Sequence, residues 1–416
     1  MKTRVCIVGA GAAGMSCAYA LSKHPDKYEV TIFDKQPEAG GMATSIPIDA
    51  ERYGASYIND GVQGCSPAFA NTIKMFRLLG YECAKVGMQI SFGNQTPYVS
   101  SAILARVFLD PSMRLFEFDD RSLLASIPTM FAFPRLGDVY RTWQREIEKT
   151  GATFKLGCEV KNVGGELESE TFDELVMATD ADTALKILGK SATWMERQVL
   201  GSVKYLYDVT ITHNDLEYMN KHYETSFKDS LAAEPHPEYA KEDQEAVELG
   251  RKEFKPLYYT KQYEDDKRKI EMSFDLTHYQ PQFKGIASTP GEKGLDHTPH
   301  DEKPMEQHVF QTIFLDRDSS EGMWTWNEIP KEKRIYEKWW KQQSHRWQHY
   351  AKVVPWMMFI NGKNHTHFAG AWSVLNMHEL AVTSGGDDEC ERLFKLYLAL
   401  SHGARARRED RKGFFV

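Results

Sequence analysis

The sequence predicts an α/β protein whose main domain is a doubly wound parallel sheet, and its N-terminal segment carries this prediction. Residues 5–8 form an apolar run typical of a buried strand, residues 9–14 a G-x-G-x-x-G turn, and residues 15–23 a helix. A second alternating strand at 30–34 ends in Asp34, whose carboxylate can accept hydrogen bonds from ribose hydroxyls. This order of elements predicts a Rossmann-like domain that binds a dinucleotide.

The glycines of the turn have different expected tasks. Gly9 permits the tight turn, Gly11 lets the backbone approach a pyrophosphate, and Gly14 lets the helix pack against the strand. The phosphates are expected on the unpaired N–H groups around Ala12 and Ala13, at the positive end of the helix dipole.

A second pair of glycines follows Asp34, because the sequence continues through Lys35 to Gly40, Gly41 and Met42. This arrangement resembles the extended FAD fingerprint of the flavin amine oxidase and phytoene desaturase superfamily, in which the Gly-Gly turn lies against the phosphates. The resemblance implies FAD as the cofactor, with all five of these residues at its site. Many relatives have Arg after the paired glycines, so Met42 removes one charge contact.

Three further stretches extend the resemblance. Gly61, Val62 and Gln63 match a glycine-bearing stretch that passes along the isoalloxazine ring in the superfamily, although a surface turn with a solvated Gln63 is an equal alternative. Val160 matches a residue that reads the adenine through its main chain. Ala178, at the tip of a later strand, matches a position close to the cofactor.

The C-terminal part resembles the closing F-A-G-D/E … A-x-x-S-G element of the superfamily, where a strand meets a helix beside the flavin. Gly370, Ala371, Trp372 and Ala381 match it, and we expect the helix at 387–400. Ala371 stands where an acid often contacts the ribityl chain. No Cys lies just upstream of Gly370, so the FAD is expected to be non-covalent.

Gln63, His378 and Glu379 are the candidate catalytic residues. His378 and Glu379 lie between the halves of the closing element, where either side chain could reach the flavin. An imidazole titrates in the range useful for a proton acceptor. The alternative is that His378 and Glu379 cap or orient the final helix.

The rest of the chain shows weaker patterns. Helices are expected at 67–79, 101–133, 138–149 and 335–354, and strands at 89–92, 98–99, 151–163, 172–180, 203–212, 270–276 and 308–314. The apolar segment 101–133 could roof a pocket or form ordinary core, and the aromatic stripe of 335–354 is typical of core. The polar stretches 232–255 and 286–306 predict a solvated helix and an exposed loop.

These patterns predict two domains with the flavin between them. The FAD-binding domain comprises residues 1–64, 134–185 and 351–416, and an inserted mixed-sheet α+β substrate domain comprises residues 65–133 and 186–350.

Composition narrows the class of protein. The 416 residues are 42% hydrophobic and 26% charged with a net charge of -8, which is ordinary for a globular chain and argues against a nucleic-acid partner. No apolar run reaches the roughly eighteen residues of a membrane-spanning helix, and the cysteines lack C-x-x-C spacing. His297, His300 and His308 match no ligand signature, so we expect no metal. We expect a cytoplasmic protein with reduced thiols.

The resemblance implies an FAD-dependent oxidoreductase that oxidises or desaturates a small, largely apolar substrate by hydride transfer to flavin N5. One alternative is a redox-neutral double-bond isomerase of a polyunsaturated fatty acid or polyene, in which the flavin takes a hydride and returns it. Another is a non-catalytic flavin-binding partner protein. The sequence leaves open the substrate, the electron acceptor, the catalytic base and the oligomeric state.

Overall fold

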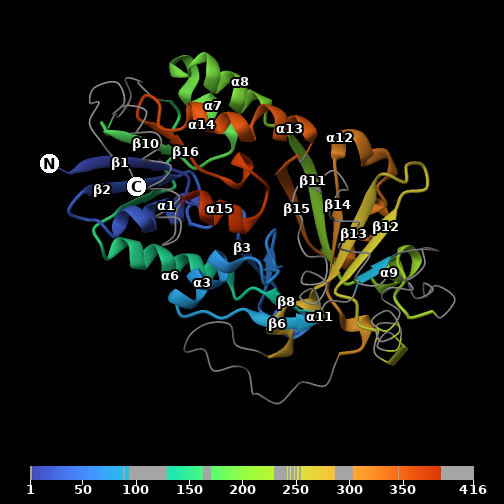
Figure 1. Ribbon diagram of the computed structural model, residues 1–416. Helices are drawn as coiled ribbons and strands as arrows, with labels where there is room; N and C mark the ends of the chain where they lie inside the picture. The colour runs from blue at the N-terminus through green and yellow to red at the C-terminus, as the bar shows by residue number, and fades with distance from the viewer. Residues whose placement is uncertain are drawn as a thin grey trace.

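The computed structural model describes residues 2–87, 90–92, 129–162, 170–228, part of 241–285, 303–344 and 346–385. Figure 1 shows two main sheets side by side. The first is parallel throughout, in the order β16-β10-β1-β2-β9. Its strands are β1 (Thr3–Val8), β2 (Tyr28–Asp34), β9 (Thr153–Leu156), β10 (Glu174–Met177) and β16 (Thr366–Phe368).

Helices cover both faces of this sheet, because side chains along β1 alternate between two cores. Val5 and Ile7 pack with α1 (Ala12–Ser22), α3 (Ala70–Leu78), α6 (Leu136–Glu148) and α15 (His378–Gly385). Cys6 and Val8 pack on the other side with α7 (Ala181–Leu188), α8 (Trp194–Ser202) and α14 (Met357–Ile360). The predicted doubly wound sheet is confirmed.

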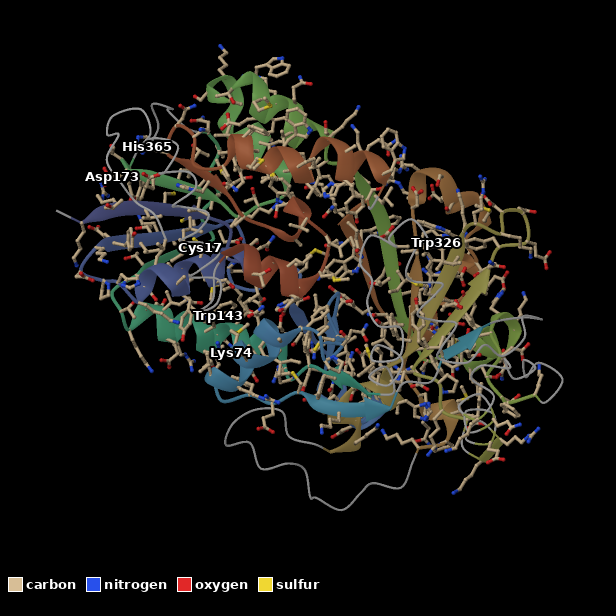
Figure 2. The ribbon with its side chains drawn as sticks, viewed as in Figure 1. Cys17, Lys74, Trp143, Asp173, Trp326 and His365 are labelled. Atoms are coloured by element: carbon tan, nitrogen blue, oxygen red, sulfur yellow. The ribbon has the colours of Figure 1, made fainter. Side chains whose placement is uncertain are left out.

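Helix α6 illustrates why these segments are helical. Its buried residues Leu136, Val139, Tyr140, Trp143 and Ile147 recur at helical spacing on one face. Trp143, labelled in Figure 2, is 1% exposed and packs edge-on against Tyr19 of α1. The buried stripe therefore holds α6 against α1 and the sheet.

The second sheet is mixed, in the order β15-β11-β14-β13-β12-β7, with only β7 parallel to its neighbour among the described strands. Its strands are β7 (Ile90–Phe92), β11 (Tyr205–His213), β12 (Tyr258–Gln262), β13 (Ile270–Asp275), β14 (Phe310–Phe314) and β15 (Arg334–Gln343). The strands predicted at 203–212, 270–276 and 308–314 are confirmed as β11, β13 and β14.

Smaller elements complete the described fold. Two small sheets pair β3 (Thr44–Pro47) with β4 (Tyr57–Asp60), and order β5 (Gly64–Cys65), β8 (Thr129–Ala132) and β6 (Ala84–Gly87) as β5-β8-β6. Further α-helices of the described residues are α2 (Ala50–Tyr53), α9 (Leu216–His222), α11 (Leu276–Tyr279), α12 (Arg317–Ser320) and α13 (Trp347–Lys352).

The helix predicted at 335–354 is wrong over its first half. Strand β15 occupies residues 334–343 and pairs antiparallel with β11 from Gln343 opposite Tyr205 to Arg334 opposite His213. Trp339 and Trp340 consequently point to opposite faces, with exposed fractions of 42% and 5%. Only α13 of the expected helix remains.

Three other predictions need correction or fall outside the described residues. The described part of the helix expected at 101–133 is strand β8, and the strand expected to continue through 157–162 is irregular. The helix near the C-terminus begins at His378, whereas the predicted 387–400 lies outside the described residues, as do 98–99, 101–128, 286–302 and most of 232–255.

The predicted domain boundaries remain predictions. The structure shows, however, that two segments of the predicted substrate domain pack against the first sheet. Helix α8, which we assigned to the substrate domain, contributes Val199 and Leu200 to a core of the first sheet. Phe76 of α3 lies in the other core of that sheet.

Gly14 provides a test of the packing between β1 and α1. A Cβ at Gly14 would lie 1.8 Å from the Gly9 carbonyl oxygen, so Gly14→Ala should lower the unfolding free energy by at least about 2 kcal/mol. The matched control is Gly201→Ala in α8, where the nearest atom to a Cβ is 3.9 Å away. Denaturant unfolding followed by circular dichroism should show Gly201→Ala unchanged or up to about 1 kcal/mol more stable. Equal stability of the two variants would contradict the predicted close contact.

Candidate functional site

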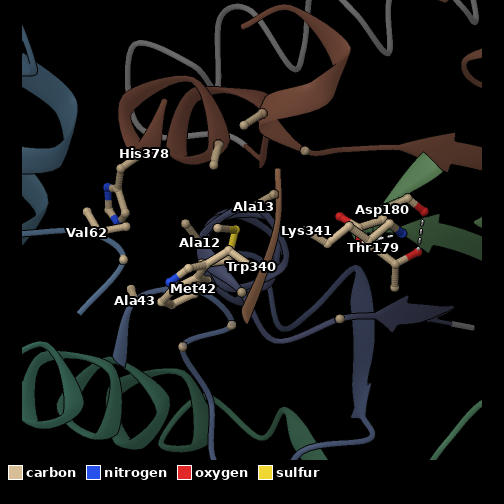
Figure 3. Close-up of a pocket in the computed structure, with 18 of the residues that line it drawn as sticks. Ala12, Ala13, Met42, Ala43, Val62, Thr179, Asp180, Trp340, Lys341 and His378 are labelled. Carbon is tan, nitrogen blue, oxygen red and sulfur yellow. Dashed lines mark hydrogen bonds and ion pairs between the residues drawn. The ribbon is translucent and has the colours of Figure 1, made fainter. Parts of the chain in front are cut away.

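A cavity of about 1030 Å³ lies between the two main sheets and is lined by residues of both. One end is formed by the carboxyl ends of β1 and β2 and by the N-terminus of α1, and the other by β11, β13, β14 and β15. Parallel α/β sheets bind ligands at the carboxyl ends of their strands. Figure 3 shows α1 nearly end-on at the centre of the lining residues, with Ala12 and Ala13 labelled.

Two glycines of the first turn are required by the protein's own packing, and the third is not. Gly9 has φ +110°, and a Cβ there would lie 2.4 Å from the Ala178 carbonyl oxygen. Gly14 is equally restricted by the Gly9 carbonyl. At Gly11, however, the nearest atom to a Cβ is Gly41 Cα at 3.9 Å. Gly11 therefore keeps open space that faces the cavity.

The N-terminus of α1 is open toward this space. Gly11 is its N-cap and makes no side-chain capping bond, and the first turn has no acidic residue. The first N–H groups of a helix have no partner within it, and Ala12 and Ala13 both line the cavity. An anion in the cavity would meet unpaired donors and the positive end of the dipole.

The paired glycines pack directly on the first turn. Gly40 N–H donates to the Ala10 carbonyl at 2.9 Å, and Gly40 and Gly11 form an isolated parallel bridge. Gly40 and Gly41 have φ of +137° and +61°, a region that favours glycine. Both line the cavity together with Met42.

Asp34 lines the same end and is held in a fixed orientation. Its Oδ2 accepts from Ala10 N at 2.7 Å, and its Oδ1 accepts from Gln36 N at 2.8 Å. Each oxygen retains acceptor capacity for a hydroxyl group. Lys35 and Val160 line the cavity beside it.

The middle of the cavity is formed by the remaining predicted cofactor residues. Gly61 has φ +71°, and a Cβ there would lie 2.6 Å from the Trp340 ring, so the indole packs directly on the turn. Trp372 Nε1 donates to the Thr179 carbonyl at 2.9 Å. The other lining residues of the prediction are Val62, Gln63, Ala178, Gly370, Ala371 and Ala381. Of the predicted cofactor-binding residues, only Gly14 does not line the cavity.

Gln63 is buried at 9% exposure and belongs to a network of amides. Its Nε2 donates to Gln311 Oε1, and its Oε1 accepts from Gln280 Nε2 at 3.2 Å. Gln311 Nε2 donates in turn to Asp60 Oδ1 at 3.0 Å. Gln63 is thus a buried residue at the cavity wall. This differs from the alternative interpretation of the sequence, in which Gln63 was solvated on a surface turn.

His378 lines the cavity at the start of α15, near Val62 in Figure 3. Its Nε2 lies 2.8 Å from the Tyr140 hydroxyl and its Nδ1 lies 3.1 Å from Thr72 Oγ1. Burial lowers the His378 pKa to about 4, so the imidazole is neutral at pH 7. Its role as a base remains a prediction.

Glu379 lies outside the cavity lining and caps a different helix. Its Oε1 accepts from the backbone and side-chain nitrogens of Asn71 at 2.9 and 2.7 Å, and its Oε2 accepts from Thr72 N at 2.9 Å. These bonds satisfy the N-terminus of α3. The structure therefore places Glu379 as a cap of α3, whereas the alternative in the sequence concerned the final helix.

One group of potential metal ligands occurs among the described residues. His308 Nδ1 and His278 Nδ1 lie 2.8 and 3.1 Å from Asp275 Oδ2, and His308 Nε2 lies 2.9 Å from the Lys303 carbonyl oxygen. Both imidazoles therefore lie against the buried Asp275 carboxylate. His297 and His300 lie outside the described residues, and the expectation of no metal remains a prediction.

Sequence reasoning missed the wall that the second sheet contributes. Met272 and Phe274 of β13 and Gln311 and Ile313 of β14 line the cavity at alternate positions. Trp340 lies beside Met42 and Ala12 in Figure 3, and its Nε1 donates to Thr210 Oγ1 at 3.0 Å. The alternation on the predicted strands was the available signal, but it does not say which face meets the cavity.

The buried His378 makes protein stability depend on pH. The unfolded imidazole has a pKa of 6.5 and the folded one about 4, so the unfolded state binds more protons between these values. The contribution of neutral His378 to the unfolding free energy is fully present above pH 6.5. Up to about 3 kcal/mol of this contribution is lost as the pH falls toward 4. His378→Gln lacks this term, so its stability deficit against wild type should narrow between pH 6.5 and 4 in denaturant titrations.

The difference in unfolding free energy between wild type and His378→Gln isolates the contribution of His378 from those of other buried groups. Burial also lowers the His213 pKa, to about 3, but His213 is present in both proteins and cancels in the difference. A deficit that stays constant between pH 6.5 and 4 would show that His378 is not buried as a neutral imidazole.

Comparisons with known proteins address the fold. Residues 7–73 match a family described as an NAD(P)-binding Rossmann-like domain. No protein of curated function matches the chain in sequence. No described helix is long and apolar enough to cross a membrane.

Three solved structures illustrate the structural similarity. A CLA-producing fatty acid isomerase from P. acnes has a TM-score of 0.57 at 13% identity, over 94% of this chain and 99% of its own. Cyclohexylamine oxidase from Brevibacterium oxydans has a TM-score of 0.55 at 13% identity, over 97% and 100%. A putative protoporphyrinogen oxidase from Exiguobacterium sp. has a TM-score of 0.54 at 10% identity, over 96% and 99%. The chain therefore shares its overall fold with these three structures over almost its whole length.

Proposed function

We propose that this protein is an FAD-dependent oxidoreductase that oxidises or desaturates a small, largely apolar substrate by hydride transfer to flavin N5. The observation that carries the proposal is the continuity of one cavity from the glycine turns to the apolar wall of the second sheet. Ligand pockets typically measure about 300–1,000 Å³, so a cavity of about 1030 Å³ is large for a single small ligand.

The residues present fit FAD. The open space at Gly11 and the unpaired N–H groups of α1 suit a pyrophosphate, and Gly40 and Gly41 supply a second turn against it. Asp34 and Val160 would hold the adenosine end, and Gly61 to Gln63 would lie along the ring end. When bound, FAD would supply the hydride acceptor.

The opposite wall supports a neutral, apolar substrate. Met130, Met272, Phe274 and Ile313 line it, and the amides of Gln63 and Gln311 are polar groups among them. Lys341 of β15 also lines the cavity, but its ammonium is paired with Asp180 and Asp182. The acidic residues that line the cavity are Asp34, Glu159 and Asp180, all contributed by the first domain. A cationic amine would therefore meet no carboxylate at the described part of this wall.

The protein's own groups would position the substrate and exclude water. The Trp340 indole packs on Gly61 at the cavity wall, and its Nε1 is held by Thr210. The amides of Gln63 and Gln311 are held by their network, so they can orient a polar group of the substrate without reorganising. Neutral His378, which lines the cavity and is held by two hydroxyl groups, is the proposed proton acceptor, although its pKa of about 4 makes it a weaker base than an exposed imidazole.

A redox-neutral double-bond isomerase is the second candidate. The absence of a carboxylate from the described apolar wall favours an unsaturated hydrocarbon chain over an amine. One of the similar structures is a fatty acid isomerase, which shows that this fold accommodates such chemistry.

Replacing Gly11 tests the cofactor site directly. Gly11→Leu should fold normally but lose bound FAD, because its side chain would enter the space assigned to the pyrophosphate. The measurement is the flavin absorbance per chain after gel filtration, with thermal unfolding as the check on folding. Gly322→Leu is the control, since no atom lies within 4 Å of a Cβ at this position. A folded Gly11→Leu protein with full flavin absorbance would refute the assignment.

Anaerobic turnover separates the two candidate functions. With polyenes, unsaturated fatty acids or amines as substrates, an oxidoreductase should bleach the flavin and release a product that lacks a pair of hydrogen atoms. An isomerase should release a product of unchanged mass with the flavin oxidised at the end of turnover. A flavin that neither substrates nor chemical reductants bleach would favour the non-catalytic flavin-binding protein.

A further inference from the structure

A surface of unusual composition lies on α13, the 3-10 turn Val354–Trp356 and α14. Five large side chains stand out there with exposed fractions between 37% and 70%: Trp347, Tyr350, Trp356, Met358 and Phe359. We call these five residues the aromatic face. Figure 1 shows α13 and α14 next to each other in the upper part of the molecule, with α8 above α14.

The segment that carries the aromatic face also has a buried apolar side. Val353, Met357 and Ile360 on the inner side are 0%, 6% and 1% exposed and pack in a core of the first sheet. Surface helices normally have one apolar side, so a segment that is apolar on both sides has an outer side without a described partner.

Exposed apolar side chains concentrate in this part of the described chain. Of the twelve large hydrophobic residues that are exposed, seven lie between residues 347 and 377. Trp356 and Phe359 pack with ring centroids 5.6 Å apart, and Trp356 Nε1 donates to the Ala351 carbonyl at 3.1 Å. The face is therefore pre-ordered, which lowers the entropy cost of binding.

The chain segment that carries the aromatic face has charges of one sign only. Residues 338–378 contain no Asp or Glu, whereas the chain average of 59 in 416 would give about six in these 41 residues. Arg346, Lys352 and Lys363 are exposed in the same stretch. Although the whole chain has a net charge of -8, this surface complements a negatively charged partner.

The aromatic face adjoins the rim of the cavity. His349, on the inner side of α13, lies 2.9 Å from Gln343 Nε2 and 3.2 Å from the Val374 carbonyl oxygen through its Nε2. Gln343 and Met377 line the cavity, and Val374 and Met377 are 44% and 42% exposed. Helix α13 is thus joined to the cavity lining through His349 and Gln343, and the exposed apolar side chains of Val374 and Met377 belong to the same part of the chain.

We propose that the aromatic face docks on the surface of an anionic phospholipid bilayer, so that an apolar substrate passes from the lipid into the cavity. Exposed Trp and Phe side chains insert at the level of the headgroups, and Arg and Lys bind the acidic lipids. Docking itself needs no flavin, and only the delivery of substrate rests on the proposed function.

Vesicle flotation with the full-length, flavin-loaded protein tests the proposal. The vesicles contain phosphatidylcholine with about one third phosphatidylglycerol, and pure phosphatidylcholine vesicles serve for comparison. Wild type should float with the anionic vesicles, more weakly at high salt. Met358→Asp and Phe359→Asp should each reduce the bound fraction at least about tenfold. Leu78→Asp is the matched control, since Leu78 is 56% exposed on α3, on another side of the molecule.

Charge variants probe the electrostatic part separately. Lys352→Gln should weaken vesicle binding about fivefold. Lys74→Gln on α3, labelled in Figure 2 away from α13 and α14, should leave binding unchanged. Thermal unfolding and flavin content show whether each variant is folded.

Three results would overturn the proposal. They are wild-type protein that does not float with anionic vesicles, face variants that float as well as Leu78→Asp, and a dimer that Phe359→Asp dissociates in the absence of lipid. The last result would identify a second copy of the chain as the occupant. None of them bears on whether FAD is bound.

Discussion

The close approach of three backbone segments at Gly9 is the constraint on which the rest of the site depends. The end of β1, the first turn of α1 and the end of β10 meet so closely that neither Gly9 nor Gly14 could carry a side chain. This packing fixes where α1 begins and aims its N-terminus at the cavity. The turn at Gly40 and Gly41 packs against the same region, because Gly40 pairs with the backbone of Ala10 and Gly11.

A buried network of amides holds the second sheet over this centre. Asn59 N donates to Gln280 Oε1 at 2.8 Å, and Gln280 Nε2 returns a bond of 2.9 Å to the Asn59 carbonyl. Gln63 and Gln311 extend the network to the cavity wall. Paired buried amides specify one geometry, because any shift would leave donors unsatisfied. These hydrogen bonds therefore define the position of the apolar wall relative to the glycine turns. The Trp340 ring packs on Gly61 where the two meet.

The sequence was informative where backbone constraints dictate residue type. The glycines of the turns and Asp34 predicted the first domain, since few residues fit those positions. Strand β15 was missed because its aromatic residues fit both a helical and an alternating period, and only pairing with β11 decides between them. On β13 the usual pattern is inverted: buried Glu271 faces a core with tyrosine partners, while Phe274 faces the cavity. Such long-range partners leave no local signal.

The most direct test of the account is the identity of the cofactor that the purified protein releases on denaturation, determined by mass and absorbance. The protein should release FAD in stoichiometric amount and without a covalent link, because the second glycine turn and the open space at Gly11 complete a site for its pyrophosphate. Release of NAD or NADP, or a colourless protein that does not take up FAD on incubation, would contradict it.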